Sequence, residues 1–250
     1  MKIFTLNCQK AYQPNFENFI IHILKEEKYD FLLLQEITEQ IIVLIKNASQ
    51  NYKILNSYDS NLGENTGVCI LYKKEFVLTD DTFLSFAILN TDSPRRGWGF
   101  VGGKFTKDNE VIFISTIHLH PGLRPHKRLK QLEIIKAKIL EENLNNPIVI
   151  GGDFNTGFPF EITNQEKILS PEFSRINKTL GPTLDSRYTE QTPFFITKIA
   201  NFFASIGISV KLKTDHIYVN KFITQNLKVN CKLLPDRISD HLAIDVFLIV

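Results

Sequence analysis

The sequence contains few cysteines, and their arrangement excludes a disulfide scaffold. The three, Cys8, Cys69 and Cys231, are scattered along 250 residues and are odd in number. They form no CxxC pair and no framework of paired spacings. This pattern favours a reducing compartment.

Long apolar runs are also missing. No stretch approaches the roughly 20 apolar residues that a membrane-spanning helix needs. The first ten residues, MKIFTLNCQK, lack the apolar centre of a signal peptide and already resemble a strand. We therefore expect a soluble, cytoplasmic protein with no transmembrane segment.

A strong excess of charge of one sign is absent as well. The formal net charge is +2, and 43% of the residues are hydrophobic. This composition is typical of a globular protein that is long enough to bury a large core. The charge balance neither indicates nor excludes a nucleic-acid-binding protein.

Strand and helix patterns alternate at the start of the chain. Residues 2–7 predict a strand that ends in the polar Asn7. Pro14 then opens a predicted helix, whose apolar side chains recur at helical spacing. Residues 31–36 predict a second strand, and Thr38 is the candidate N-cap of the helix that follows it.

The rest of the chain predicts more strands than helices. Residues 52–119 predict a succession of strands, the last two joined by a hairpin turn at 107–110. A helix with Leu129, Leu132, Ile135 and Ile139 on one side comes next. The further elements that we expect are a strand at 147–150, a short helix near 161–169, an apolar stretch at 194–206, and strands at 215–219, near 228–234 and at 242–250. Strand clusters in both halves predict two sheets that pack face to face and are covered by helices.

Polar residues stand at the ends of five of these apolar runs. They are Asn7, Glu36, His118, Asp153 with Asn155, and Asp240 with His241. The run before Asp153 ends in two glycines, within GGDFN at 151–155, and an ordinary turn is the alternative explanation for that one motif. Burying so many polar groups without partners would be costly, so we expect them to gather in one site.

The chemistry of these side chains points to a hard cation and a phosphate. Glu36, Asp240 and the amide oxygen of Asn7 are oxygen ligands that suit Mg²⁺ or Mn²⁺. Asp153 and Asn155 could position a water, and two histidines could donate to a phosphoryl group. Metal-assisted hydrolysis of a phosphoester needs these parts.

A zinc site is the alternative for the histidines. His118 and His120 alternate on one strand and so face the same side. A metallo-β-lactamase pattern would need Asp and His at positions 122 and 123, where this chain has Gly122 and Leu123. We therefore expect His120 to be a neighbour of the site, and we expect the aromatic residues Tyr72 and Trp98 to serve in packing.

Six short motifs give the sequence a family resemblance. TLN at 5–7, LQE at 34–36, TIHL at 116–119, GDFN at 152–155, DHI at 215–217 and SDH at 239–241 resemble the endonuclease/exonuclease/phosphatase superfamily in order and rough spacing. The resemblance extends over nearly the whole chain. It implies a single catalytic domain over residues 1–250, with a four-layer α/β/β/α sandwich of two packed mixed sheets flanked by helices.

The resemblance also implies roles for residues around the metal and the attacking water. Glu36 matches the principal metal ligand, Asn7 lies beside the metal and the phosphate, and Asp240 lies near the metal. Asp153 matches the carboxylate that orients or deprotonates the attacking water. Asn155 matches the amide that helps to hold water and phosphate.

Three more residues match the phosphate-facing side of the family site. His241 matches the histidine that contacts the scissile phosphate, either as a base or as a stabiliser of developing charge. Asp215 matches the acid that orients this histidine. His118 matches a second histidine near the leaving group.

A basic run begins the helix that follows His118. Its members are Arg124, Lys127, Arg128 and Lys130, which we predict to contact substrate phosphates. A solvated helix face is the alternative. Arg128 and Gln131 also match an Arg-x-x-Gln spacing common in this family, and these two could be structural.

The function that the resemblance favours is a Mg²⁺- or Mn²⁺-dependent phosphodiesterase that acts on nucleic acid. His118 resembles a histidine shared by deoxyribonucleases, tyrosyl-DNA phosphodiesterases, inositol polyphosphate phosphatases and sphingomyelinases. NCQ at 7–9 and KLKTDHIYV at 211–219 are most similar to the pancreatic-type deoxyribonuclease and tyrosyl-DNA phosphodiesterase branch. The alternative is an enzyme acting on inositol phosphates or phospholipid headgroups. A catalytically inert binding domain is a further alternative, and we expect a monomer.

Overall fold

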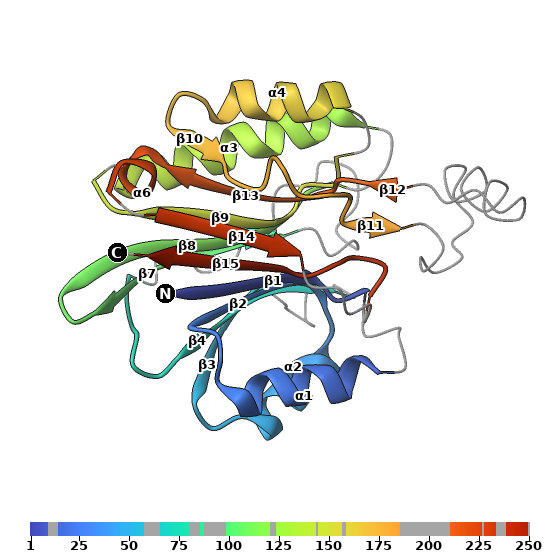
Figure 1. Cartoon of the computed structure of the whole chain (residues 1–250), viewed down its shortest axis with the longest axis vertical. Helices are drawn as coiled ribbons and strands as arrows, with labels where there is room; N and C mark the ends of the chain where they lie inside the picture. The colour runs from blue at the N-terminus through green and yellow to red at the C-terminus, as the bar shows by residue number, and fades with distance from the viewer. Residues whose placement is uncertain are drawn as a thin grey trace, which may run out of the picture.

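The computed structural model describes residues 1–9, 15–57, 66–80, 86–87, 99–120, 124–143, 145–156, 159–185, 211–226, 228–233 and 239–249. Two mixed sheets lie face to face, with helices outside each of them (Figure 1). Pro14, Trp98 and the apolar stretch at 194–206 lie outside the described residues. The predicted α/β/β/α architecture is confirmed.

The first sheet joins the two ends of the chain. Its strands, in spatial order, are β14 (Lys228–Leu233), β15 (Ile244–Ile249), β1 (Lys2–Asn7), β2 (Phe31–Ile37), β4 (Gly67–Lys73) and β3 (Tyr52–Asn56). β1 and β2 are parallel, and β1 pairs with β15 in antiparallel fashion. The parallel pair brings the carboxyl ends of β1 and β2 to one edge of the sheet.

The second sheet is built around another parallel pair. Its strands, in spatial order, are β10 (Phe173–Arg175), β13 (Asp215–Asn220), β9 (Ile148–Asp153), β8 (Glu110–His118), β7 (Gly99–Lys107) and β5 (Val77–Asp80), with β6 (Phe86–Ala87) also on β7. β8 and β9 are parallel, and β7 and β8 form the expected hairpin. A separate ribbon pairs β11 (Leu184–Asp185) with β12 (Lys211–Leu212).

Helices cover the outer face of each sheet. On the first sheet lie α1 (Phe16–Glu26) and α2 (Glu39–Ala48), on the second lie α3 (Pro125–Asn143) and α4 (Pro159–Leu169), and α6 (Lys221–Asn226) connects β13 to β14. Thr38 caps α2 as predicted, because its side chain accepts a hydrogen bond from the backbone nitrogen of Ile41. Among the described helices, none is both long and apolar enough to cross a membrane.

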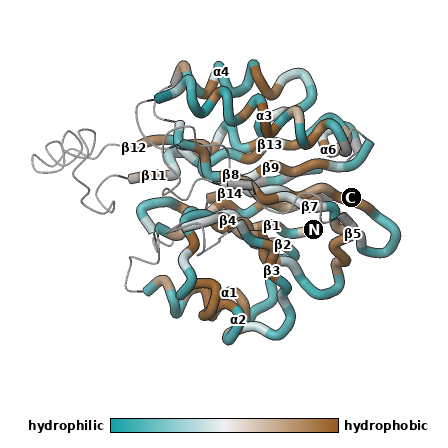
Figure 2. Tube along the Cα trace, turned by 180° about the vertical axis from the view of Figure 1, so that it is seen from behind, coloured by the Kyte–Doolittle hydropathy of each residue, from teal (hydrophilic) through white to brown (hydrophobic). Residues whose placement is uncertain are grey.

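Three hydrophobic clusters lie between the four layers. Figure 2 shows hydrophobic segments along the strands of the two sheets. The central cluster joins the sheets and includes Ile3, Leu33, Ile114, Val149 and Ile217, together with Tyr72 as expected. Side chains alternate between the two faces of a strand. Asn7, His118, Asp153 and Asp215 therefore face the same inter-sheet space as this cluster, at one end of it.

Candidate active site

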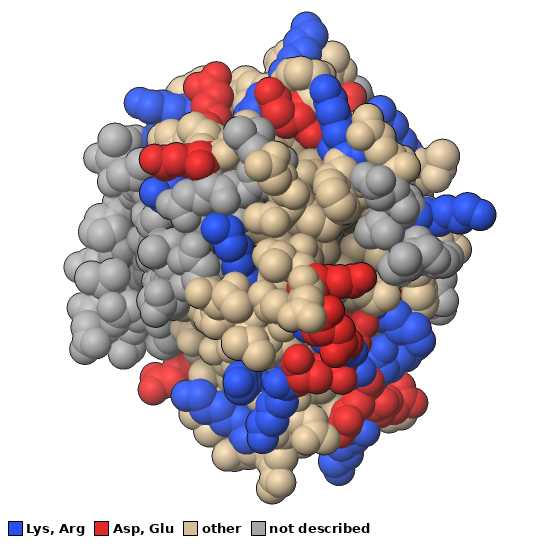
Figure 3. Space-filling model, turned by 90° about the vertical axis from the view of Figure 1, so that its left-hand side faces the viewer, with Lys and Arg blue, Asp and Glu red and all other residues tan. Residues whose placement is uncertain are grey.

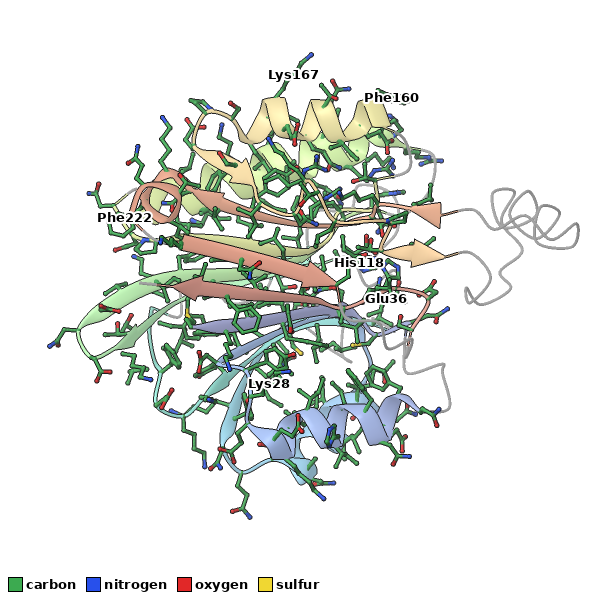
Figure 4. The ribbon with its side chains drawn as sticks, viewed as in Figure 1. Lys28, Glu36, His118, Phe160, Lys167 and Phe222 are labelled. Carbon is green, nitrogen blue, oxygen red and sulfur yellow. The ribbon has the colours of Figure 1, made fainter. Side chains whose placement is uncertain are left out.

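The carboxyl ends of β1, β2, β8 and β9 meet at one edge of the two sheets. Asn7 Nδ2 lies 2.9 Å from Asp153 Oδ2 and 3.3 Å from Glu36 Oε1. His118 Nε2 lies 3.7 Å from each of the same two carboxylate oxygens. Figure 4 shows Glu36 and His118, which come from different sheets, at the same end of the molecule. Four residues that are far apart in the sequence thus form one polar cluster.

A bulge in β2 turns Glu36 toward this cluster. Strict alternation would place Glu36 on the outer face with Leu32 and Leu34, which pack under α1 and α2. Instead, the register with β4 shifts between Gln35 and Ile37, and Glu36 has a φ of 52°. A left-handed non-glycine residue at a bulge is costly, and bulges commonly re-aim side chains beside active sites.

The two glycines of GGDFN have separate structural reasons. Gly152 has a φ of 137°, and a Cβ at this position would lie 2.2 Å from the carbonyl oxygen of Ile117. A Cβ at Gly151 would lie 2.8 Å from Leu33 Cδ1, at the contact between the sheets. Glycine thus lets β9 lie close to β8 and to the first sheet.

The chain beyond β9 makes a turn that holds Asp153 and Asn155 at the edge. Asn155 has a φ of 51°, and its backbone nitrogen donates to Asp153 Oδ1 at 2.7 Å. Its side-chain Nδ2 donates to the carbonyl oxygen of Leu119 at 2.8 Å. The turn alternative and the site prediction therefore describe the same conformation, because the turn fixes both side chains.

Asp215 and His241 form a buried hydrogen-bonded pair. Asp215 Oδ2 lies 2.7 Å from His241 Nδ1, and the backbone of His241 bridges to Leu184. Burial alone would lower the pKa of His241, but the carboxylates of Asp215, Asp240 and Asp153 outweigh burial and hold that pKa well above its usual value. The imidazole is therefore held as a cation that faces the cluster with Nε2.

The pKa values of Asp153 and Asp215 are shifted in opposite directions. Burial raises the pKa of Asp153 to about 6, although the positive charge of His241 lowers it. For Asp215 the burial effect is smaller than the combined effect of His241 and the hydroxyl groups of Thr183 and Thr214, so its pKa is lowered. Two buried carboxyl groups thus differ in basicity, and Asp153 is the better proton acceptor near neutral pH.

Thr183 and Thr214 are site residues that the sequence did not reveal. Thr214 Oγ1 donates to Asp215 Oδ2 at 2.9 Å, and Thr183 Oγ1 accepts from the backbone nitrogens of Thr214 and Asp215. Thr214 directly precedes DHI, so adjacency to that motif was an available signal. Thr183 lies in the segment after residue 156, where the sequence has little regular pattern, and it carried no such signal.

The oxygen donors of the cluster fit a hard divalent cation. Glu36 and Asp153 converge from the two sheets, and the side chain of Glu36 is 25% exposed, so solvent reaches it. Asn7 presents its amide nitrogen to both carboxylates, because its oxygen accepts from the backbone nitrogen of Gln9 at 3.0 Å. In this orientation Asn7 fits a position beside a cation better than the predicted position of a ligand.

Two further acidic side chains, Asp215 and Asp240, lie next to His241. Asp240 Oδ1 lies 3.8 Å from His241 Nε2. Among the described residues, Asp153, Asp215 and His241 have potential ligand atoms within 4.8 Å of one another and could hold a metal. His118 and His120 of the zinc alternative do not belong to that group.

The predicted phosphate-binding residues divide into two groups. Arg124 and Lys130 are exposed at the start of α3, and Lys127 is half-buried there. Arg128 is buried, is 2% exposed, and pairs with the buried Glu161 of α4. Its placement contradicts the prediction that it contacts substrate, because its guanidinium group is enclosed between α3 and α4. The structural interpretation of the Arg-x-x-Gln spacing is the one that fits.

The face at the opposite end of the strands differs from the site. Lys, Arg, Asp and Glu side chains are intermixed on it (Figure 3). The site end instead combines a carboxylate cluster with the basic start of α3. This arrangement can hold a cation and a phosphate, donate a proton from a buried imidazole, and accept one at Asp153.

Comparisons with known proteins agree with this arrangement. A family model described as "Endonuclease/Exonuclease/phosphatase family" matches residues 4–241. No curated protein matches the chain significantly in sequence.

Solved structures share the fold at low sequence identity. D. rerio TDP2 in complex with single-strand DNA product is 16% identical with a TM-score of 0.77, over 100% of this chain and 99% of that one. Bacteroides thetaiotaomicron mannosyl-6-phosphatase is 15% identical with a TM-score of 0.72, over 100% of both chains. Staphylococcus aureus beta toxin is 14% identical with a TM-score of 0.70, over 99% of both chains.

Proposed function

Because the chain belongs to the endonuclease/exonuclease/phosphatase family, we propose that it is a divalent-metal-dependent phosphodiesterase whose substrate is a nucleic acid. The fold is that of a phosphoester hydrolase. The observation that carries the proposal is the contact between two groups: His241, which pairs with Asp215 at 2.7 Å, places its Nε2 3.9 Å from Asp153 Oδ2 of the Asn7–Glu36–Asp153 cluster. A cationic imidazole and a proton acceptor thus lie next to each other.

Glu36 would hold the metal as its principal ligand, with Asp240 nearby. Enzymes of this family depend on divalent metals, and Mg²⁺ and Mn²⁺ both suit carboxylate donors. A bound cation would supply positive charge that neutralises the phosphate oxygens. Asn7, whose amide nitrogen faces both carboxylates, would donate a hydrogen bond to a phosphate oxygen.

Side chains of the protein carry out the proton transfer and stabilise the charge that develops during hydrolysis. Asp153 accepts a proton from the attacking water, which Asn155 helps to hold. The water oxygen bonds to phosphorus as the bond to the leaving oxygen breaks. His241, kept cationic by Asp215, stabilises the charge that develops on the phosphate, and His118 faces the leaving group.

Two observations support a nucleic acid as the substrate. The basic start of α3, with Arg124, Lys127 and Lys130, follows the His118 strand and could contact phosphates away from the scissile one. The similar D. rerio TDP2 structure is a complex with a single-strand DNA product. Arg128 has no part in this surface.

A sugar or lipid phosphate is the second candidate. The similar structure from B. thetaiotaomicron is a mannosyl-6-phosphatase, which makes a phosphomonoester a real alternative. Inositol phosphates are phosphomonoesters as well, whereas phospholipid headgroups are joined to the lipid through a phosphodiester. An inert binding domain is disfavoured because the predicted carboxylates and both histidines lie together in the structure.

A substrate panel in Mg²⁺ and in Mn²⁺ tests the proposal. It contains single- and double-stranded DNA, RNA, a phosphotyrosyl oligonucleotide, a soluble inositol phosphate and sphingomyelin. We expect a DNA or a phosphotyrosyl oligonucleotide to be cleaved most efficiently, and chelation to abolish cleavage. Faster hydrolysis of the inositol phosphate or of sphingomyelin than of any oligonucleotide would reject nucleic acid as the substrate. If no substrate of the panel is hydrolysed, the inert binding domain is favoured.

A further inference from the structure

Two side chains of α3 hold the backbone of one residue just beyond the His118 strand. Gln131 Oε1 accepts a hydrogen bond from the backbone nitrogen of His120 at 2.9 Å. Arg128 Nη1 donates to the carbonyl oxygen of the same residue at 3.0 Å. Both side chains are buried. Since one helix satisfies both polar backbone groups of His120, α3 fixes the chain where it leaves β8.

The neighbouring residue carries this constraint into the site. The backbone nitrogen of Leu119 donates to the carbonyl oxygen of Asp153 at 2.9 Å, and its carbonyl oxygen accepts from Asn155 Nδ2 at 2.8 Å. A displacement of His120 would therefore move the group that aims Asn155. It would also move His118, the last residue of β8, which lies two residues earlier in the chain.

Arg128 extends the connection to the chain that leaves β9. Its Nη2 donates to Glu161 Oε1 of α4, and Glu161 is 1% exposed. α4 is joined to that chain by a hydrogen bond between Gln165 and Thr156 at 3.2 Å. A buried ion pair is a poor source of stability, because desolvation offsets the attraction, so a role in fixing geometry accounts for it better.

We propose that Arg128, Gln131 and Glu161 form a positioning clamp for the active site. The positioning clamp sets the alignment of the chain ends of β8 and β9, and therefore of His118 against Asp153 and Asn155. It rests on the proposed phosphodiesterase function. Its members act through the backbone of His120 and through α4, so they are positioning residues.

Two variants remove parts of the positioning clamp with little change in volume. Gln131→Leu deletes the acceptor for the His120 nitrogen, and Arg128→Lys keeps the charge but loses the two-pronged donor. On a small chromogenic phosphodiester in Mg²⁺, we expect each to lower kcat about 100-fold with little change in KM, since misalignment by about 1 Å has this effect. Gln131→Glu keeps an oxygen at the same place and should restore most of kcat.

A matched control uses another ion pair of the same helix. Lys136 Nζ lies 2.6 Å from Glu172 Oε2, and this pair anchors α3 away from the His120 contact. Lys136→Met should lower the Tm and leave kcat unchanged. If Gln131→Leu and Arg128→Lys lower the Tm in the same way but keep the wild-type kcat, the positioning clamp is rejected.

A second measurement separates this inference from the proposed function. If the wild-type protein hydrolyses no phosphodiester, the proposed function fails, and hydrogen exchange then decides the fate of the positioning clamp. We expect Gln131→Leu to reduce the protection of the Leu119 amide, which donates to Asp153 and not to Gln131. Unchanged protection at Leu119 would show that the constraint does not reach the site, and it would overturn the inference.

Discussion

At the scale of single residues, His241 depends on its buried partner. Asp215 lies 2.7 Å from its Nδ1 and is itself held by Thr214. We expect Asp215→Asn and His241→Asn each to lower kcat by about 10²- to 10⁴-fold, the range for acid–base groups. Because the two act as a unit, the double variant should lose little more than either single variant.

A double-mutant cycle on kcat measures this coupling, and Asp245 provides the control. Asp245 is a buried aspartate of the other sheet, where it accepts a hydrogen bond from Tyr29. Asp245→Asn should lower stability, with an effect on kcat that simply multiplies with that of His241→Asn. If the losses of Asp215→Asn and His241→Asn also multiply, the pairing is wrong.

His216, next to Asp215, gives a prediction about acid stability. Its ring is buried, with Nε2 3.0 Å from Thr156 Oγ1. Burial, and to a smaller extent the charge of Arg175, lowers the pKa of His216 to about 3, although the charge of Asp215 acts in the opposite direction. The unfolded state therefore binds one more proton between about pH 6.5 and pH 3. Stability is full above pH 6.5 and is lost as the pH falls.

Replacing His216 should remove this pH dependence. Between pH 7 and pH 5, the wild-type protein should lose about 2 kcal/mol of unfolding free energy through this residue, which His216→Asn should not lose. Urea unfolding at both pH values in the presence of chelator measures the difference. His22→Asn is the control, because His22 is 67% exposed on α1 and should leave the pH dependence unchanged.

At the scale of elements, the start of α3 should contribute to nucleic-acid affinity. Lys127 and Lys130 lie in its first two turns. Replacing both by alanine removes two phosphate contacts, so the slope of log affinity against log salt should flatten by roughly 1.4 for a single strand and roughly 1.8 for a duplex. Fluorescence anisotropy over a range of salt concentrations measures the slope.

The control for this prediction carries the same change of charge on the other layer. Lys46 is exposed in α2, which covers the first sheet, and Lys53 is exposed in β3, the edge strand of that sheet. Replacing both by alanine should leave the slope unchanged. An equal effect of the two double variants would mean that net charge, and not a surface on α3, governs binding.

The sequence revealed the elements better than it revealed their irregularities. The strand at 31–36 and the cap at Thr38 follow from periodicity and local hydrogen bonding, which act within a few residues. The turn of Glu36 into the site does not follow, because strict alternation places it on the outer face and only pairing with β4 reveals the bulge. The LQE motif pointed to Glu36 through the family resemblance and did not require the bulge.

Arg128 shows a second limit of sequence reasoning. A charged residue in a helix with other charges is expected at the surface, and its burial depends on Glu161, which is 33 residues away. Thr183 is similar, since its contacts with Thr214 and Asp215 join segments separated by a stretch with little pattern. Long-range polar contacts leave no periodic signal, so the structure was needed to find them.

At the scale of the whole molecule, a divalent cation should stabilise the fold through Glu36. A ligand at about 100 times its Kd adds about 2.7 kcal/mol of stability, which corresponds to roughly 5 to 11 °C in Tm for a chain of this size. We expect Mg²⁺ or Mn²⁺ to raise the Tm and Glu36→Gln to lose most of the increase. Glu39→Gln, an exposed residue in the first turn of α2, should keep it. An equal rise in the Glu36 variant would place the metal elsewhere.

The central core predicts that the chain unfolds as one unit, as expected for the single domain that we propose. Ile3 and Leu33 of the first sheet pack in the same cluster as Ile114 and Ile217 of the second, so neither sheet keeps its inner face buried without the other. Ile217→Ala should cost about 2 to 5 kcal/mol. Hydrogen exchange of the most protected amides should show this loss equally in β1, which belongs to the opposite sheet, and in β13, which contains the substitution. A loss confined to the second sheet and its helices would mean that the two halves unfold independently, and the single-domain proposal would then have to be abandoned.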